Sequence, residues 1–155
     1  MSRIKPDDIK VFSDAAGAFF YQTTGIAASV RTAYMLDGKE RIDQNYYQSK
    51  IALGGQFEGM VAFSAPRALL TNILLRMGES DYSDASHHDI TGEIANQMSG
   101  YVRRYFGEGM DISPPQALAH TNTFAHIGIE EHSFVIPMLW DSYEAKLFVS
   151  IKKIA

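Results

Sequence analysis

The stretch GEIANQMSG, residues 92–100, places a carboxylate and a side-chain amide one helical turn apart, at Glu93 and Asn96. The two groups can accept and donate hydrogen bonds, but they include no nucleophile with a neighbouring base. Glycines flank the stretch at Gly92 and Gly100. Glycine weakens a helix, so the presence of these residues together in the longest predicted helix requires an explanation.

A helical wheel of about 100° per residue separates this pair from the apolar residues around it. One side of the wheel collects Ile90, Ile94, Met98, Tyr101 and Tyr105. Glu93 and Asn96 fall on the opposite side, which we expect to face away from the core. Two interpretations stay open, an ordinary solvated surface and a contact site. Polar stripes without a motif are common, so the wheel alone favours an ordinary surface. The glycines argue for the contact site, because each costs about 1 kcal/mol relative to alanine in a helix interior.

Two shorter helices are expected before this one. Pro6, followed by two aspartates, is typical of a helix start, and Gly25 predicts the end of that helix. Pro66 opens the second helix, PRALLTNILLRM, and Gly78 closes it.

The third helix is the longest, and it carries the polar pair. Ser86 stands three residues before Asp89, a capping-box pattern that predicts the start of the helix, and Gly107 predicts its end.

The remaining segments have the composition of strands. NYYQSKIALGG and QFEGMVAFSA meet at Gly54-Gly55 and predict a β-hairpin, and QALAHTNTF, HSFVIPMLW and AKLFVSIKKI predict three later strands. The order helix, hairpin, two helices, three strands predicts an α/β (α+β) fold of two or three layers with a largely antiparallel sheet. No linker or low-complexity tract interrupts it, so we expect one domain over residues 1–155.

Composition narrows the classes of function. The 155 residues are 46% hydrophobic and 21% charged, an ordinary balance for a globular protein. A net charge of −4 argues against a surface for nucleic acid or anionic membranes. The absence of cysteine excludes disulfides, thiolate zinc sites and a cysteine nucleophile. The N-terminus lacks the apolar stretch of a signal peptide, and no apolar run is long enough to span a bilayer, so we expect a cytoplasmic protein.

The histidines raise the alternative of a metal site. His87 and His88 are adjacent and project in different directions on a helix, and Glu93 does not stand four residues from His88. The other histidines are evenly spaced through predicted strands and turns, at His120, His126 and His132. These three share a strand face only if no turn intervenes, and GIEEH is expected to be a turn. We therefore expect solvated or loop-capping histidines, with His87 or His88 at the border of a partner interface.

EIANQMSG followed by DISPP resembles the CheX branch of the CheC/CheX/FliY phosphatases of bacterial chemotaxis. Members of that family carry Glu-x-x-Asn on a long helix, a glycine four residues after the Asn, and an Asp-Ile-(Ser/Thr)-Pro-Pro turn into a strand. Glu93, Asn96, Gly100 and the segment 111–115 match these positions one by one. The order of elements also fits along nearly the whole chain.

The resemblance implies a CheC-like fold and a phosphatase acting on the aspartyl phosphate of a response-regulator receiver domain such as CheY. An acyl phosphate is already activated, so its hydrolysis needs a water held in line with the phosphorus more than a strong base. Asn96 would orient that water, and Glu93 would pair with the receiver's active-site lysine. Mg²⁺ would be carried by the receiver, with no cofactor of this chain's own. Gly92 and Gly100 would let the receiver's loops reach the helix.

The resemblance also implies a homodimer whose sheets join across the interface. The final apolar strand, AKLFVSI, suits such edge pairing, although burial in the core would explain it equally well. CheC-type relatives carry a second motif on the first helix, where this chain reads VFSDAAGAFF, so a single site is expected. The alternative to a phosphatase is a receiver-binding or adaptor module of the same fold that does not accelerate hydrolysis.

Overall fold

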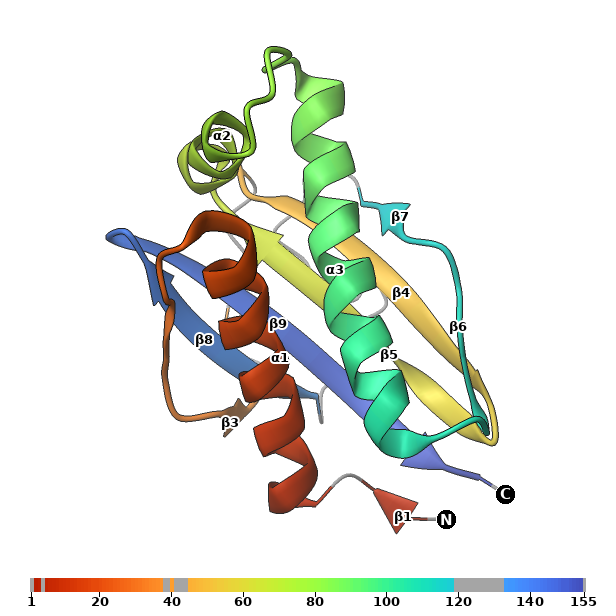
Figure 1. Cartoon of the computed structure of the whole chain (residues 1–155). Helices are drawn as coiled ribbons and strands as arrows, with labels where there is room; N and C mark the ends of the chain where they lie inside the picture. The colour runs from red at the N-terminus through yellow and green to blue at the C-terminus, as the bar shows by residue number, and fades with distance from the viewer. Residues whose placement is uncertain (1, 4, 38–39, 41–44, 119–132, 155) are drawn as a thin grey trace.

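The computed structural model describes residues 2–3, 5–37, 40, 45–118 and 133–154. Its helices lie across one face of an antiparallel sheet (Figure 1). This arrangement confirms the predicted α/β (α+β) fold with a largely antiparallel sheet and one long helix.

The helices begin and end close to where the sequence predicts. α1 spans Pro6–Thr24 and ends at Gly25, whose φ of 76° lets its N–H bond the carbonyl of Tyr21. α2 spans Arg67–Arg76 and follows Pro66. α3, the longest, spans Asp84–Phe106.

The strands are β1 (Ser2–Arg3), β2 (Ser29–Val30), β3 (Tyr34–Met35), β4 (Tyr47–Gly55), β5 (Phe57–Ala65), β6 (Met110–Ile112), β7 (Gln116–Ala117), β8 (Phe134–Trp140) and β9 (Tyr143–Lys153). β4 and β5 form the predicted hairpin, in register from the pair Tyr47 and Ala65 to the pair Leu53 and Gly59. Of the expected strand QALAHTNTF, the structure describes only 116–118, and β7 covers its first two residues.

The sheet order is β2-β8-β9-β5-β4-β6, with β1 beside β9, β3 beside β8 and β7 beside β4. β9 therefore lies between β8 and β5, hydrogen-bonded on both sides. The suggestion that AKLFVSI pairs with a second copy as an edge strand is wrong, and burial within the sheet explains its apolar character. A homodimer stays a prediction.

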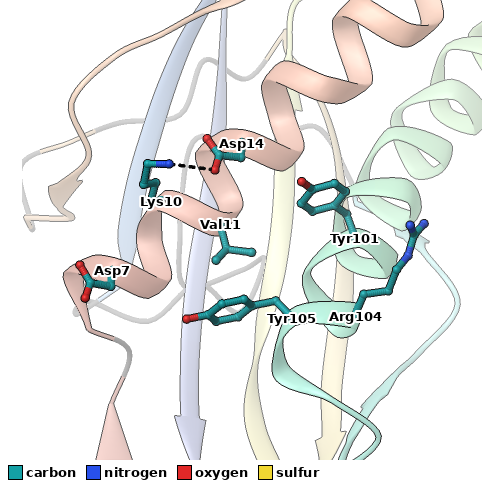
Figure 2. Close-up of a pocket in the computed structure, with 7 residues that line it drawn as sticks. All are labelled: Asp7, Lys10, Val11, Asp14, Tyr101, Arg104 and Tyr105. Atoms are coloured by element: carbon teal, nitrogen blue, oxygen red, sulfur yellow. Dashed lines mark hydrogen bonds and ion pairs between the residues drawn. The ribbon is translucent and has the colours of Figure 1, made fainter.

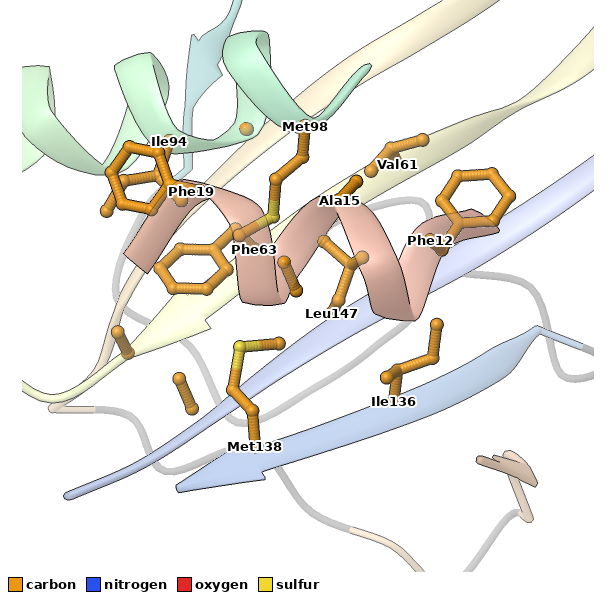
Figure 3. Packing of buried hydrophobic residues seen from close by; sticks show 14 of the residues in the cluster. Phe12, Ala15, Phe19, Val61, Phe63, Ile94, Met98, Ile136, Met138 and Leu147 are labelled. Atoms are coloured by element: carbon orange, nitrogen blue, oxygen red, sulfur yellow. The ribbon is translucent and has the colours of Figure 1, made fainter. Parts of the chain in front are cut away.

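The main core lies between the sheet and the helices (Figure 3). Phe12 and Phe19 of α1 and Met98 of α3 pack towards Phe63 of β5 and Leu147 of β9. Each fully buried side chain of this size contributes about 1.5–3 kcal/mol. This packing fixes the orientation of α3 on the sheet, because rotating the helix would expose its apolar stripe.

A second apolar cluster forms around Leu36, Met60, Ala62, Val135 and Phe148.

No helix in the described part of the chain is long and apolar enough to cross a membrane.

Candidate active site

α3 positions the candidate residues, and a serine starts it. Ser83 is the N-cap, and its Oγ accepts a hydrogen bond from the backbone N–H of Ser86 at 3.2 Å. The prediction that Ser86 caps the helix is therefore wrong, since the helix begins at Asp84. At the other end Gly107 follows the last turn, as expected. The Arg103 side chain ties that end to the sheet, its Nε donating to the carbonyl of Met110 at 2.8 Å.

The inward face of α3 is buried along its length, through Ile90, Ile94, Ala95, Met98 and Val102. Glu93 is exposed and Asn96 is half-buried. The predicted outward orientation of this polar pair is thus what the structure shows.

Tyr101 and Tyr105 depart from the wheel's prediction of a core position. Their exposed fractions are 39% and 54%, and Figure 2 shows both rings projecting from α3 towards α1. The Tyr105 hydroxyl lies 3.3 Å from Asp8 of α1, and the charge of that carboxylate raises the pKa of Tyr105. The two rings border a groove between the helices that the helices leave open to solvent.

The two site residues differ in their hydrogen bonding. The Glu93 Oε1 accepts from the Gln97 Nε2 at 2.9 Å, a contact that spans one turn of the helix. Asn96 makes no side-chain hydrogen bond with any residue that the structure describes. Its amide can therefore both donate to and accept from an incoming molecule without first breaking an internal bond.

Glu93 also borders a groove of about 290 Å³ between α3 and the end of α2. Leu74, Met77 and Ile90 supply its apolar lining. The polar lining consists of Glu79, Asp81, Ser86 and Asp89 besides Glu93. Several carboxylates around Glu93 make this end of the helix attractive to a cation.

The two flanking glycines have different surroundings. A Cβ atom on Gly92 would lie 3.2 Å from the Cβ of Pro115, so the segment 111–115 of this same chain packs against it. The expectation that Gly92 makes room for a receiver loop is wrong, because the chain itself fills that space. A Cβ on Gly100 would meet nothing within 4 Å, and Gly100 is partly exposed.

The segment 111–115 runs beside β4. Asp111 and Ile112 pair with Gly54 and Leu53, and Ser113 exchanges hydrogen bonds of 2.8 and 2.9 Å with the backbone of Ala52. Pro115 of the second motif therefore packs against Gly92, the residue that directly precedes Glu93 of the first motif.

A polar cluster beneath the start of α3 was missed by the sequence analysis. The Tyr47 hydroxyl donates to Asp84 and accepts from Arg67, whose guanidinium lies 3.4 Å from the same carboxylate. Burial raises the pKa of Tyr47, and the hydrogen bond to Asp84 raises it further, whereas Arg67 opposes the shift. This cluster links β4, α2 and the first turn of α3.

His87 is fully buried, so the expectation that it is solvated or borders a partner interface is wrong, while the same expectation for His88 stays a prediction. Its Nδ1 lies 2.7 Å from the Ser83 carbonyl oxygen, which can only accept, so Nδ1 carries a proton. Its Nε2 lies 2.6 Å from Thr71 Oγ1 of α2. His88 is partly exposed and lies 3.6 Å from Asp84. The helical spacing of His87 from Ile94 and Met98 was the available signal for its burial.

The described residues contain no group of three or more His, Cys, Asp or Glu side chains that could hold a metal ion. His120, His126 and His132 lie outside the described residues.

Solved structures identify the class of fold. The chain is similar to a CheC-like superfamily protein from Shewanella sp. PV-4, with 19% identity and a TM-score of 0.78 over 96% of this chain and 99% of that one. It is similar to the chemotaxis protein CheX from Vibrio vulnificus, with 17% identity and a TM-score of 0.77 over 94% of this chain and 99% of that one. It also matches a chain of the CheX–CheY–BeF₃–Mg²⁺ complex from Borrelia burgdorferi, with 17% identity and a TM-score of 0.72 over 96% and 100%. The fold is therefore CheC-like.

The sequence narrows this class to one family. Residues 47–139 match the family described as chemotaxis phosphatase CheX, a range that includes Glu93, Asn96, Gly100 and 111–115. The chain belongs to the CheX family. No curated protein matches it in sequence.

Proposed function

We propose that this chain hydrolyses the aspartyl phosphate of a response-regulator receiver domain, with α3 docked over the receiver's phosphorylation pocket. The observation that carries the proposal is the placement of Asn96 in a chain of the CheX family. Its amide lies on the outward face of a long, well-packed helix and makes no hydrogen bond with a described residue.

Asn96 would orient the attacking water. Hydrolysis of an acyl phosphate needs that water in line with the phosphorus, and a neutral amide can accept from it and donate to a phosphoryl oxygen. An amide also avoids the repulsion that a carboxylate would meet at the negatively charged phosphoryl group. The rigidity of α3 supports this role, because a loosely held amide would lose the alignment that makes it effective.

Glu93 would pair with the receiver's active-site lysine. It is exposed, its carboxylate is held by Gln97 across one turn, and the groove beside it carries further carboxylates from Glu79, Asp81 and Asp89. A lysine approaching this end of α3 would form a charge-assisted hydrogen bond and set the register of docking.

The complex of CheX with CheY, BeF₃ and Mg²⁺ from Borrelia burgdorferi supports a receiver as the partner. BeF₃ bound to a carboxylate has the shape and charge of a phosphoryl group. We infer that Mg²⁺ would likewise arrive with the receiver, since a carboxylate-rich pocket around the phosphoryl group suits this ion.

The test is single-turnover loss of phosphate from a CheY-type receiver domain, phosphorylated with a small acyl phosphate in the presence of Mg²⁺. The parent chain is expected to accelerate the loss, and Asn96→Ala is expected to reduce the acceleration roughly 100-fold without loss of folding. Binding to the BeF₃-loaded receiver is measured in parallel and should change little in Asn96→Ala.

The rival interpretation, a receiver-binding module without catalysis, gives a different result. The parent chain would then bind the BeF₃-loaded receiver, yet phosphate loss would be no faster than the receiver's own decay. That outcome would reject the proposed phosphatase activity and leave the proposed receiver-binding surface on α3 in place.

A further inference from the structure

The outward stripe of α3 continues beyond the candidate active site. Glu93, Gln97, Gly100 and Arg104 follow one another at spacings of four, three and four residues, so they lie within a narrow sector of the helix. Glu93 and Arg104 are about three turns, or about 16 Å, apart on this stripe. The stripe thus has a carboxylate at one end and a guanidinium at the other.

Arg104 is exposed and makes no ion pair with any residue that the structure describes. Its Cζ lies 6.0 Å from the centre of the Tyr101 ring, a cation–π contact that limits the freedom of its side chain. Figure 2 shows its guanidinium pointing away from the Tyr105 ring, and Arg104 also lines the groove between α1 and α3. Arg103 differs, because its guanidinium group is engaged with the carbonyl of Met110.

The surface around Arg104 is hollowed on both sides. A groove of about 580 Å³ lies between α1 and α3, and Tyr101, Arg104 and Tyr105 line it on the side of α3. On the side of α1 its lining is Asp7, Val11 and the ion pair of Lys10 with Asp14. A second hollow, of about 490 Å³, is lined by Gly100, Arg103 and Arg104 of α3 and by Gly107, Glu108 and Ile112 beyond its end. Between Asn96 and Arg104 the stripe carries no side chain at Gly100, where an added Cβ would meet nothing within 4 Å. A partner backbone can therefore approach α3 between these two residues.

We propose that Arg104 is a second anchor for the same receiver, binding an acidic segment on the rim of its phosphorylation pocket. This inference rests on the proposed function. A receiver pocket that holds Mg²⁺ and a phosphoryl group is built from carboxylates, so its surroundings are anionic. A standard interface covers about 800 Å² on each partner, a patch roughly 30 Å across, so an anchor about 12 Å along the helix from Asn96 lies inside it. Tyr and Arg are also the residue types enriched in binding hot spots.

The opposite charges at the two ends of the stripe give the contact a direction. Glu93 attracts the receiver's lysine and Arg104 attracts its acidic rim, so a receiver turned end for end would meet like charges. A different role for Arg104 is stabilisation of the helix dipole, since it lies in the last turn with Arg103. That role would affect the stability of the chain and leave its affinity for the receiver unchanged.

The experiment compares the parent with Arg104→Gln, Arg104→Glu and Lys152→Gln. Lys152 is a matched control: it pairs with Glu58 on the sheet, away from α3, and its loss changes net charge as much as Arg104→Gln does. KM and kcat are measured on the phosphorylated receiver, and Kd on the BeF₃-loaded receiver, at low and high salt.

We expect Arg104→Gln to raise KM and Kd about five-fold and Arg104→Glu more than ten-fold, with kcat unchanged and the differences reduced by salt. Lys152→Gln should stay within about two-fold of the parent.

The outcomes separate this inference from the proposed function. If the parent binds the BeF₃-loaded receiver but does not accelerate phosphate loss, the proposed phosphatase activity is rejected. The Kd values of the Arg104 variants still test the second anchor in that case. Unchanged KM and Kd in both Arg104 variants overturn the second anchor, as does a change in kcat alone. Sedimentation of the free chains tests whether a second copy of this chain, and not the receiver, binds the stripe. A shift in oligomeric state in Arg104→Glu would show such a contact and would also overturn the proposal.

Discussion

Gly92 and Pro115 touch so closely that a Cβ atom on Gly92 would lie 3.2 Å from the Cβ and 3.4 Å from the Cγ of Pro115. This contact joins the helix that carries Glu93 and Asn96 to the segment beside β4. These distances are shorter than ordinary van der Waals contact, so a side chain at position 92 would require Pro115 to shift by a few tenths of an ångström. The contact thereby helps to hold the candidate site on a fixed support.

Gly92→Val is expected to destabilise the chain by about 1–3 kcal/mol, because the added methyl groups must push Pro115 away from α3. The measurement is the free energy of unfolding from urea titration. Retention of full stability would mean that segment 111–115 moves freely and does not support the helix.

Gly100→Ala is the matched control and should behave in the opposite way. Its Cβ meets nothing, so the gain in helix propensity should stabilise the chain by about 0.5–1 kcal/mol. Affinity for a BeF₃-loaded receiver should nevertheless fall, because the methyl group blocks the approach of the partner's backbone. A stabilised variant with unchanged affinity would show that no backbone passes close to Gly100.

Much of the fold followed from short-range signals. Pro6 and Gly25 predicted α1, and Gly54-Gly55 predicted the hairpin, because these residues act on the backbone within a few positions. The outward orientation of Glu93 and Asn96 followed from helical periodicity alone.

The errors arose where distant segments decide the outcome. For β9 an edge position and burial within the sheet were both left open, because strand order depends on pairing with β5 and β8, which periodicity does not encode. Tyr101 and Tyr105 lie on the apolar side of the wheel, but the helices leave a groove open there. Gly92 was expected to make room for a partner's loop, because the sequence does not reveal that Pro115 of the same chain occupies the adjacent space.

The start of α3 offers a test of local structure. Ser83→Ala should cost about 1 kcal/mol of stability, because the N–H of Ser86 loses its acceptor at the first turn. Ser86→Ala should cost less than about 0.5 kcal/mol, since the Ser83 cap remains. Urea titration of both variants measures the difference, and equal losses would contradict a cap at Ser83.

The cluster around Tyr47 predicts an alkaline sensitivity. Its pKa is raised from the usual value of 10.0, first by burial and then by the hydrogen bond to Asp84. Below pH 10 both the folded and the unfolded chain hold the phenolic proton, so the contribution of Tyr47 is fully present there. Above pH 10 the unfolded chain loses the proton first, and stability falls as pH rises towards the folded-state pKa.

Tyr47→Phe should therefore flatten the loss of stability above pH 10, at a cost of about 1 kcal/mol near neutral pH from the lost hydrogen bonds. Part of the alkaline loss should remain, because the pKa of Tyr105 is raised as well. Unfolding free energies between pH 8 and 11 provide the comparison. An unchanged slope in Tyr47→Phe would show that Tyr47 titrates alike in both states.

The effect of the negative charge of Glu93 can be measured separately from the effect of its side-chain shape, because glutamine has nearly the same shape without the charge. Glu93→Gln keeps an oxygen that can accept from the Gln97 Nε2, so the local hydrogen bond and the helix should persist. Only the charge that would bind a receiver lysine is lost. A charge-assisted bond is roughly twice as strong as a neutral one, so we expect KM for the phosphorylated receiver to rise about ten-fold, with kcat nearly unchanged.

Asp89→Asn is the control, since Asp89 is exposed one turn earlier on the same helix and lines the same groove. If Glu93 makes a specific pair, Asp89→Asn should raise KM less than about three-fold and lose even that effect at high salt. Equal effects of the two variants would instead mean that the acidic end of α3 attracts the receiver only through its general field, with no lysine bound at Glu93.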